Sequence, residues 1–407
     1  MKASVITLGC KINQCESESI ASILAQQGYT VDSVETDADL FVVNTCAVTA
    51  EAERKSRQAV RRLAKNNPNC KIVVVGCATQ RDGLHFAEFP NVAVVGGTYN
   101  KCGLVSGYFS GEDVKEPFAL GKSYVEYPTQ NRFHTREYVK VQDGCDRFCS
   151  YCIVPYLRGR SMSRPREKIL EQVDSSVAKE IVITGIDLSA YGKETGSSLT
   201  ELMKSIRHPR VRMGSLEPNV ITDEFLQALS SNRYCKHFHL SMQSGSDSVL
   251  KTMNRHYTAE LFLQKVALIR SYFPDANITT DIIAGFPTET EEAHNETLCT
   301  VKQAAFGDAH VFPYSERQGT RAAQLPQIPK ATRSQRAKEI AQICKQTRLT
   351  FLQSQLAKKH VVLTEQVEGE YVTGYTENYI KVYLPKQTPC NELIEMIPTE
   401  LFLDGLR

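Results

Sequence analysis

YVKVQDGCDRFCSYC, residues 138–152, carries the most informative pattern in this 407-residue chain. Its first five residues predict a β-strand, and the loop that follows places Cys145, Cys149 and Cys152 in a C-x3-C-x2-C spacing. Three thiolates in one short loop can hold three irons of a 4Fe–4S cluster and leave the fourth iron open. A cluster held by four protein thiolates only transfers electrons, whereas an open iron can bind a substrate group. The pattern therefore predicts a strand that ends in a reactive iron–sulfur site.

Further strands are expected downstream of this one. Their starts lie near Ile181, Val211, Phe238, Ile278 and Ala309. Spacings of roughly 30 to 40 residues leave room for one βα unit each. Six such units make an incomplete (β/α)6 barrel rather than the full eight. The cysteine loop then lies at the C-terminal mouth of that barrel, where enzymes of this architecture carry out chemistry.

The first hundred residues alternate strand and helix patterns, which indicates a parallel α/β sheet. Strands are expected at residues 3–8, 40–43 and 72–75, weaker ones at 30–34 and 92–95, and helices at 16–27 and 50–65. Residues 107–136 resemble a linker, and residues 330–360 predict one or two helices. From Val361 the alternation is typical of a small antiparallel β domain. The predicted fold is α/β with three domains, at residues 1–115, 136–345 and 346–407.

Three more cysteines stand out by position. Cys10, Cys46 and Cys77 each follow an apolar strand of the N-terminal sheet, in TLGC, NTC and VGC. The carboxyl edge of an open α/β sheet forms a binding crevice. These thiolates therefore predict a second cluster site with one open iron. The other cysteines lack this placement and are interpreted as small buried or incidental side chains: Cys15, Cys70, Cys102, Cys235, Cys299, Cys344 and Cys390.

Composition narrows the class of protein. No apolar run reaches the ~20 residues that a membrane span needs, and the N-terminus lacks the pattern of a signal peptide. We expect a cytoplasmic protein without a membrane partner, in which clustered cysteines serve as metal ligands or catalytic thiols rather than disulfides. A structural zinc site is the alternative for residues 145–152, but zinc normally takes four protein ligands and no fourth Cys or His stands at a matching interval.

The loop with Tyr151 directly before its third cysteine resembles the radical S-adenosylmethionine superfamily. The resemblance implies that the open iron chelates the amino and carboxylate groups of S-adenosylmethionine, that the aromatic residue contacts its adenine, and that reductive cleavage yields a 5′-deoxyadenosyl radical. It also implies cofactor contacts from strand ends, namely Thr184, Gly185, Asp187, Glu217, Gln243 and Gly285. Each of these segments alone also fits an ordinary turn, and their joint placement favours the cofactor site.

Two clusters with open irons in adjacent domains resemble the methylthiotransferases of this superfamily, whose C-terminal β domain is called TRAM. The resemblance covers essentially the whole chain and implies two 4Fe–4S clusters and two molecules of S-adenosylmethionine. TLGCKINQCESE, residues 7–18, looks like the branch that acts on N6-threonylcarbamoyladenosine at position 37 of tRNA. The branch acting on isopentenyladenosine tends to carry Gln-Met-Asn after the cysteine, and the branch acting on a ribosomal-protein aspartate carries Pro-Lys-Asn. Both remain alternatives.

The expected partners are a tRNA anticodon stem-loop and an electron donor such as a flavodoxin, with the chain acting as a monomer. Net charge is only +2, so affinity for RNA must come from local patches. Arg54, Arg57, Arg61 and Lys65 align on one helix face, and VPYLRGRSMSRP adds Arg158 and Arg160. Residues 330–360 hold eight Lys or Arg and one acidic residue. Such patches can neutralise phosphates, although a solvated helix face explains each of them equally well.

A different class of function is a non-catalytic iron–sulfur protein that binds RNA and senses redox state. An open iron argues against this class, because sensing needs no vacant site shaped for a cofactor.

Overall fold

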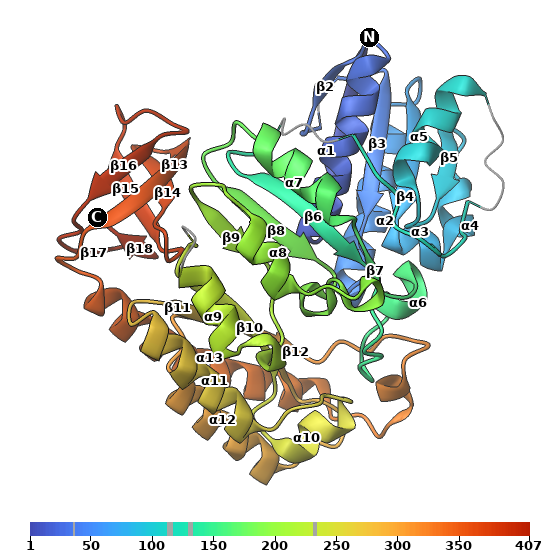
Figure 1. The fold of residues 1–407 in the computed structure, drawn as a ribbon. Coiled ribbons are helices and arrows are strands. Elements are labelled where there is room, and N and C mark those ends of the chain that lie inside the picture. Colours follow the sequence, from blue (N-terminus) through green and yellow to red (C-terminus); the bar gives the residue numbers. More distant parts are fainter. Residues whose placement is uncertain (36, 112–116, 129–132, 231–233) are drawn as a thin grey trace.

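The N-terminal domain is a parallel sheet with helices on both faces (Figure 1). The computed structural model describes residues 1–407 apart from residues 36, 112–116, 129–132 and 231–233. The strand order is β2-β1-β3-β4-β5, with β1 Lys2–Thr7, β2 Thr30–Asp32, β3 Leu40–Thr45, β4 Lys71–Gly76 and β5 Val92–Gly96. The helices are α1 Lys11–Gln26, α2 Ala50–Asn66, α3 Cys77–Arg81, α4 Gly83–Ala87 and α5 Lys101–Ser110.

Two differences from the sequence-based expectation concern helix ends. Helix α1 begins at Lys11 rather than at residue 16, because Cys10 has extended backbone angles and acts as its N-cap residue. Helix α5 extends to Ser110 and ends at Gly111 in the left-handed conformation, so the segment expected as a linker begins with helix. Both faces of the sheet are covered by buried apolar side chains, which explains the continuous Val and Ile runs of β3 and β4.

The central domain is an arc of six parallel strands, as predicted. The strands are β6 Glu137–Asp143, β8 Ile181–Gly185, β9 Val211–Met213, β10 His237–Gln243, β11 Asn277–Ala284 and β12 Asp308–Pro313. The short β7 Met162–Ser163 pairs antiparallel with β6. Isolated bridges from Val211 to Tyr234 and from Leu216 to Leu240 join the two sheets of the arc. In the described part of the chain β6 and β12 do not pair, so the barrel stays open on one side.

Helices contribute buried side chains to the core outside this arc. They are α7 Arg166–Ser175, α8 Leu199–Ser205, α9 Asp223–Ser230, α10 Asp247–Thr252, α11 Ala259–Tyr272 and α12 Glu291–Ala304. The short α6 Val154–Arg158 packs instead against the N-terminal domain, where Leu157 joins the core. Short 3-10 helices lie at η1 Leu188–Ala190, η2 Lys193–Thr195, η3 Pro218–Val220 and η4 Arg321–Gln324. None of the described helices combines the length and apolar character required to cross a membrane.

Helix α1 of the N-terminal domain packs against the inner face of β6. Val139 and Val141 of β6 belong to the core beneath the outer helices, so Lys140 between them points the other way. There its Nζ lies 2.7 Å from Oε1 of Glu16 on α1. The first helix therefore occupies part of the open arc and brings the two cysteine-bearing domains together.

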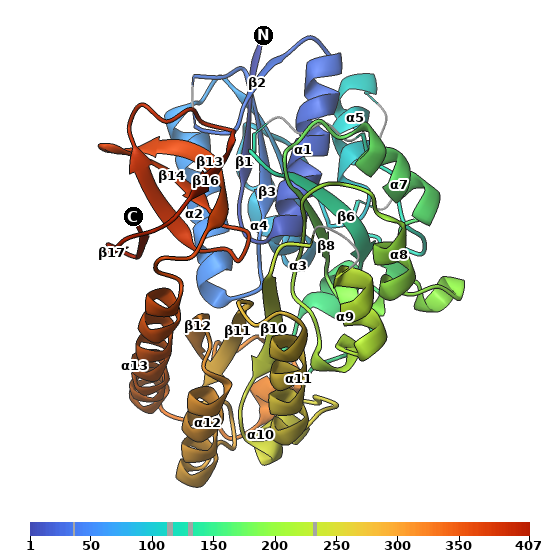
Figure 2. The same cartoon turned by 60° about the vertical axis from the view of Figure 1, so that its left-hand side comes forward.

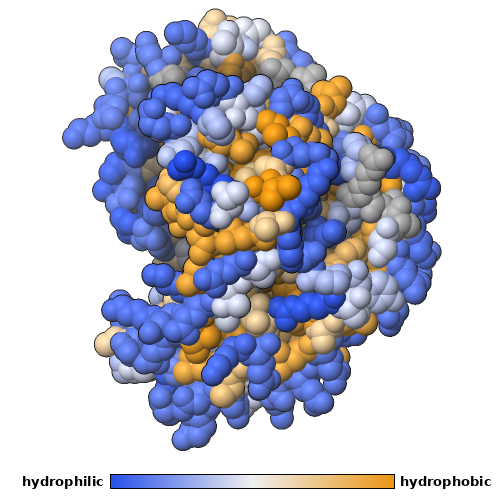
Figure 3. All heavy atoms as spheres, turned by 90° about the vertical axis from the view of Figure 1, so that its left-hand side faces the viewer, coloured by the Kyte–Doolittle hydropathy of each residue, from blue (hydrophilic) through white to orange (hydrophobic). Residues whose placement is uncertain are grey.

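The C-terminal domain is a six-stranded sheet that is mostly antiparallel, as expected. Its strand order is β16-β13-β14-β15-β18-β17, with β13 His360–Glu368, β14 Tyr371–Tyr375, β15 Lys381–Pro385, β16 Leu393–Met396, β17 Leu401–Phe402 and β18 Gly405–Leu406. One helix, α13 Lys330–Ser354, leads to it. This helix continues without interruption across residues 345 and 346, where the sequence predicts a domain boundary. In Figure 2 α13 lies beside α12 and ends below the C-terminal sheet. Figure 3 shows the surface hollowed between the barrel helices at the bottom of that view and the domains above them.

A buried ionic cluster fixes the C-terminal sheet to the barrel. Glu180, which precedes β8, is fully buried and accepts hydrogen bonds from Arg136, Arg210 and Arg212. Arg210 also donates to the carbonyls of Val361 and Tyr375, at 2.9 Å and 3.3 Å. The ionic cluster thus forms hydrogen bonds with both the barrel and the C-terminal sheet, so the two domains share one buried polar core.

Candidate active site

The loop after β6 is held in a sharp turn by its glycine. Gly144 has φ +68, and a Cβ there would lie 1.8 Å from the carbonyl oxygen of Arg160. The amide of Cys145 donates to the carbonyl oxygen of Gly159 at 3.1 Å. Only glycine tolerates this approach, which explains why the loop DGCDRFC can fold back on residues 159–160.

Each of the three thiols in this loop is approached by an N–H group. The amide of Arg147 lies 3.5 Å from Sγ of Cys145, the amide of Val154 lies 3.4 Å from Sγ of Cys152, and Nη1 of Arg255 lies 3.4 Å from Sγ of Cys149. Burial, the Asp187 carboxylate and the other two thiols together raise the pKa of Cys145 to about 12. Bound iron would replace the protons, and the N–H groups suit thiolate sulfur. The donor set fits an open-iron 4Fe–4S cluster.

Two carboxylates and two arginines border the loop. Asp187, just after β8, accepts a hydrogen bond from Nε of Arg147 at 2.7 Å and lies 3.9 Å from Sγ of Cys145. Glu217 accepts two hydrogen bonds of 2.7 Å from Nη2 of Arg255. A ligand with an amino group, a carboxylate and ribose hydroxyls would find a partner for each among these four side chains. Arg147 and Arg255 were not predicted; Arg147 stands inside the cysteine motif, whereas no local signal marks Arg255.

The remaining expected cofactor contacts surround the same mouth. Thr184 and Gly185 end β8, Gln243 ends β10, and Gly285 follows β11 directly. Gln243 has the left-handed φ of 63, which is rare for a residue with a side chain. The ring of Tyr151 meets Phe286 edge to face with centroids 6.3 Å apart. The structure thus brings all of these residues to the C-terminal ends of the strands, and their contact with a cofactor remains a prediction.

The N-terminal cysteines come from three neighbouring strands. Cys10 follows β1, Cys46 follows β3 and Cys77 follows β4, and these strands are adjacent in the sheet. The glycines before two of them permit close packing: a Cβ on Gly9 would lie 2.6 Å from Sγ of Cys46, and one on Gly76 would lie 2.5 Å from the carbonyl oxygen of Thr45. TLGC and VGC therefore need glycine where the thiols converge.

The N-terminal thiols influence one another. Burial, with smaller contributions from Cys77 and Cys10, raises the pKa of Cys46 to about 11. Among the described residues no three His, Cys, Asp or Glu side chains are placed to hold one metal ion. A 4Fe–4S cluster sets a wider spacing, because each thiolate binds a different iron. The residues fit a cluster with one open iron.

The other cysteines do not join either set. Two are exposed, Cys299 and Cys390, and five are buried among other side chains, Cys15, Cys70, Cys102, Cys235 and Cys344. Their interpretation as packing or incidental side chains agrees with these positions.

The expected RNA contacts divide into exposed and buried residues. Arg54, Arg57, Arg61 and Lys65 share one side of α2, where Arg54 pairs with Glu51 and Arg57 with Glu53. Arg160 is exposed and pairs with Asp146 at 2.8 Å.

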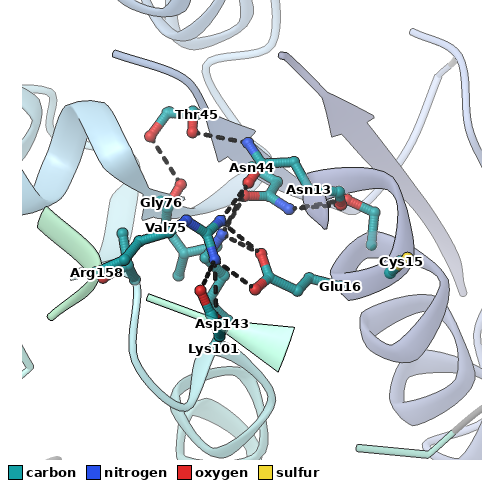
Figure 4. A network of polar contacts seen from close by, with 12 residues as sticks. Asn13, Cys15, Glu16, Asn44, Thr45, Val75, Gly76, Lys101, Asp143 and Arg158 are labelled. Carbon is teal, nitrogen blue, oxygen red and sulfur yellow. Dashed lines mark hydrogen bonds and ion pairs between the residues drawn. The ribbon is translucent and has the colours of Figure 1, made fainter. Parts of the chain in front are cut away.

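Arg158 contradicts the prediction that it contacts RNA. Its side chain is buried, and it points at Glu16 and Asp143 inside the protein (Figure 4). A basic residue in a polar loop looks like a surface residue until its carboxylate partners, far away in sequence, are known. In α13, Arg333 and Arg336 are likewise buried. Residues 330–360 therefore present fewer positive charges at the surface than their composition indicates.

The N-terminal domain and the barrel each match a known protein family. Residues 2–97 match the model of a family described as "Uncharacterized protein family UPF0004". Residues 139–298 match the radical SAM superfamily. The chain is 38% identical to threonylcarbamoyladenosine tRNA methylthiotransferase MtaB of Chlamydia pneumoniae, over 94% of this chain and 91% of that protein.

Two further relatives span similar lengths. The protein of the same name from Bacillus subtilis is 34% identical, over 92% of this chain and 88% of that protein. The tRNA-2-methylthio-N(6)-dimethylallyladenosine synthase of Carboxydothermus hydrogenoformans is 34% identical, over 96% and 92%. Among solved structures, the radical S-adenosylmethionine methyltransferase TsrM of Kitasatospora setae aligns with a TM-score of 0.58 and 14% identity, over 79% of this chain and 77% of that one. At that identity the likeness supports the fold alone.

Proposed function

Because the chain belongs to the radical S-adenosylmethionine tRNA methylthiotransferases, we propose that it adds a methylthio group to C2 of N6-threonylcarbamoyladenosine at position 37 of tRNA. The proposal includes two 4Fe–4S clusters and two molecules of S-adenosylmethionine. The observation that carries it is the pair of three-thiol sets, one in each of two domains that pack together through α1 and β6. One set alone would serve many radical reactions, whereas the second set provides a place for sulfur.

The residues divide the work between the two domains. Cys145, Cys149 and Cys152 would hold the radical cluster, and Cys10, Cys46 and Cys77 the auxiliary cluster. When bound, the clusters and S-adenosylmethionine supply a 5′-deoxyadenosyl radical and sulfur, which suits insertion at an unactivated C–H carbon. No acid–base pair could ionise such a bond.

The protein side chains position the reactants. Arg147 and Arg255 orient Asp187 and Glu217 toward the cluster loop, so these carboxylates are ready to accept hydrogen bonds from an amino group and from ribose hydroxyls. Tyr151 is packed against Phe286, which fixes its ring beside the third cysteine for contact with an adenine.

Lys11 supports the choice of the threonylcarbamoyl substrate. It follows Cys10 directly, in the segment TLGCKINQCESE that resembles the threonylcarbamoyladenosine branch. A threonylcarbamoyl group carries a carboxylate, for which a cation is a suitable partner. An isopentenyl group is apolar and gains nothing from it. Five relatives at 34–38% identity carry the threonylcarbamoyladenosine name.

The decisive experiment compares two products in one anaerobic reaction. Wild type with reductant should bind about eight irons, form 5′-deoxyadenosine and methylthiolate tRNA, as measured by nucleoside mass spectrometry. Cys46→Ala should still form 5′-deoxyadenosine and fail to methylthiolate. Normal methylthiolation by this variant would refute the auxiliary cluster, and neither product from wild type would favour the redox-sensor alternative.

The substrate is tested with tRNA carrying either modification at position 37. Threonylcarbamoyl tRNA should be the better substrate, and Lys11→Met should raise its KM more than that of isopentenyl tRNA. A preference of wild type for isopentenyl tRNA, or for a ribosomal-protein aspartate, would contradict the substrate proposal while leaving the reaction class intact.

The remaining parts of the proposal concern the setting of the reaction. We place the protein in the cytoplasm as a monomer that binds the anticodon stem-loop and receives electrons from a donor such as a flavodoxin. The tRNA named in its relatives supports the RNA partner. A footprint on the anticodon arm and a mass measurement of the free protein check these points.

A further inference from the structure

A buried charge cluster lies where the N-terminal domain meets the barrel (Figure 4). It consists of Glu16, Lys101, Lys140, Asp143 and Arg158, all of which are buried. Nζ of Lys101 lies 2.5 Å from Oε2 of Glu16, and Nζ of Lys140 lies 2.7 Å from Oε1 of the same carboxylate. Nη1 of Arg158 lies 3.0 Å from both Glu16 and Asp143. Neither thiol set needs these residues as ligands.

The cluster carries one uncompensated positive charge, since it combines three cations with two carboxylates. Burial alone would raise the pKa of Glu16, but Arg158, Lys101 and Lys140 outweigh it and hold that pKa well below its usual range. Asp143 is lowered in the same way by Arg158 and Lys140. Four neighbouring side chains add no charge of their own, because burial raises their pKa values: Cys15, Cys102, Tyr124 and Tyr127. Glu18, Glu137 and Arg164 line the same cavity as Glu16 and Lys140.

The positive charge lies directly behind the N-terminal thiols. Asn13, three residues after Cys10, accepts hydrogen bonds from Lys101 at 3.2 Å and from Arg158 at 2.9 Å. Its own amide donates to the carbonyl oxygens of Leu8 and Thr45, which precede the cysteines of β1 and β3. Leu157, next to Arg158, belongs to the same buried core as Cys77. The two cations therefore lie beside the loops that carry all three N-terminal thiols.

We propose that this buried charge cluster sets the reduction potential of the auxiliary iron–sulfur cluster, with Arg158 and Lys101 as positioning residues. One-electron reduction adds a negative charge to a cluster already surrounded by thiolates. A fixed cation in a buried site stabilises the reduced form, because it is neither screened by salt nor hydrated. The inference rests on the proposed auxiliary cluster.

Charge changes of opposite sign separate this role from a structural one. The parent is the full chain with Cys145, Cys149 and Cys152 replaced by Ala, so that only the auxiliary cluster contributes iron and an electron paramagnetic resonance signal. Arg158→Gln removes one positive charge and Glu16→Gln removes one negative charge. Arg158→Lys keeps the charge. Arg164→Gln removes another buried arginine, which pairs with Glu126 and Gln172 instead.

A redox titration with dithionite and mediators gives the ratio of reduced to oxidised cluster at each potential. A unit charge at roughly 10 Å in an effective dielectric of about 20 changes an equilibrium about tenfold. Arg158→Gln should therefore lower that ratio about tenfold at fixed potential, a shift of about 59 mV to more negative values for a one-electron couple. Glu16→Gln should shift it in the opposite direction by a similar amount, while Arg158→Lys and Arg164→Gln stay near the parent.

The outcomes that overturn the inference are distinct from failure of the proposed function. If the parent retains about four irons and the two Gln variants shift in the same direction or not at all, the charge cluster does not tune the potential. If the parent holds no iron, the auxiliary cluster itself is refuted, and the inference with it. Opposite shifts support the inference even where both variants lose some thermal stability, because damage to the fold does not depend on the sign of the charge.

Discussion

Replacing Glu180 by Gln removes a carboxylate that contacts three buried arginines at once. Its oxygens lie 2.6 Å from Nε of Arg136, 2.5 Å from Nε of Arg210 and 2.7 Å from Nε of Arg212. These arginines expose only 7%, 6% and 1% of their surface. Gln keeps the shape and one acceptor oxygen, so the variant tests the charge rather than the packing.

The expected loss of stability follows from burial. Removing one partner of a buried ion pair costs about 3–5 kcal/mol. Arg136 keeps Glu365 as a second partner and Gln retains some hydrogen bonding, so we expect about 3 kcal/mol, at the lower end. As a matched control, Glu171→Gln breaks an exposed pair with Lys168, for which less than about 1 kcal/mol is expected.

The loss is measured by urea unfolding followed by circular dichroism, since the chain has no Trp. Hydrogen exchange should accelerate in β13 and β14, which the arginines hold, more than in the N-terminal sheet. Equal destabilisation by Glu180→Gln and Glu171→Gln at neutral pH, with unchanged exchange in β13 and β14, would refute the argument.

Acidification provides a second test of the same charge. Burial alone would raise the pKa of Glu180, but Arg212 and Arg136 hold it well below its usual range. Because the pKa is lower in the folded state, the stabilisation is present above the unfolded value of about 4.3. It is lost as the pH falls toward the folded value. The difference in stability between wild type and Glu180→Gln should therefore shrink below about pH 4.

Three further predictions concern the site. Gly144→Ala should halve the iron content, because its Cβ would lie 1.8 Å from a carbonyl oxygen. The control Gly196→Ala, at φ +71 with no atom near its Cβ, should leave the iron content unchanged. Equal iron content in both variants would contradict the loop geometry. Arg61→Ala on the exposed face of α2 should weaken tRNA binding and reduce by about one the number of counterions released on binding. If filter binding shows an unchanged salt dependence, α2 does not contact the tRNA. Cys15→Ala should retain full iron, since Cys15 is buried within α1 and does not follow a strand end as the three predicted ligands do; lost iron would make it a ligand.

Much of the fold could be predicted because its signals are local. Strand runs such as residues 72–75 stand out by composition, and the cysteines after them gain meaning from the rule that parallel strands end at one edge. Arg255 could not be found in this way. It follows α10, and its contacts with Cys149 and Glu217 depend on how the chain returns to the barrel mouth. Arg158 was interpreted as an RNA contact for the same reason, because its partners Glu16 and Asp143 come from other elements.

The unbroken helix α13 determines how the C-terminal sheet can behave. Its 25 residues correspond to a length of about 38 Å at 1.5 Å per residue. The first turns of the helix are fixed to the barrel, because Arg333 donates to backbone carbonyls and Arg336 pairs with Glu289. The C-terminal sheet at the far end of this helix is also held to the barrel, because Arg210 and Arg212 donate to its carbonyl oxygens. The sheet is therefore attached at two separate places, which fixes its distance and orientation relative to the barrel. A ligand that contacted both the sheet and the barrel mouth would have to match that fixed separation.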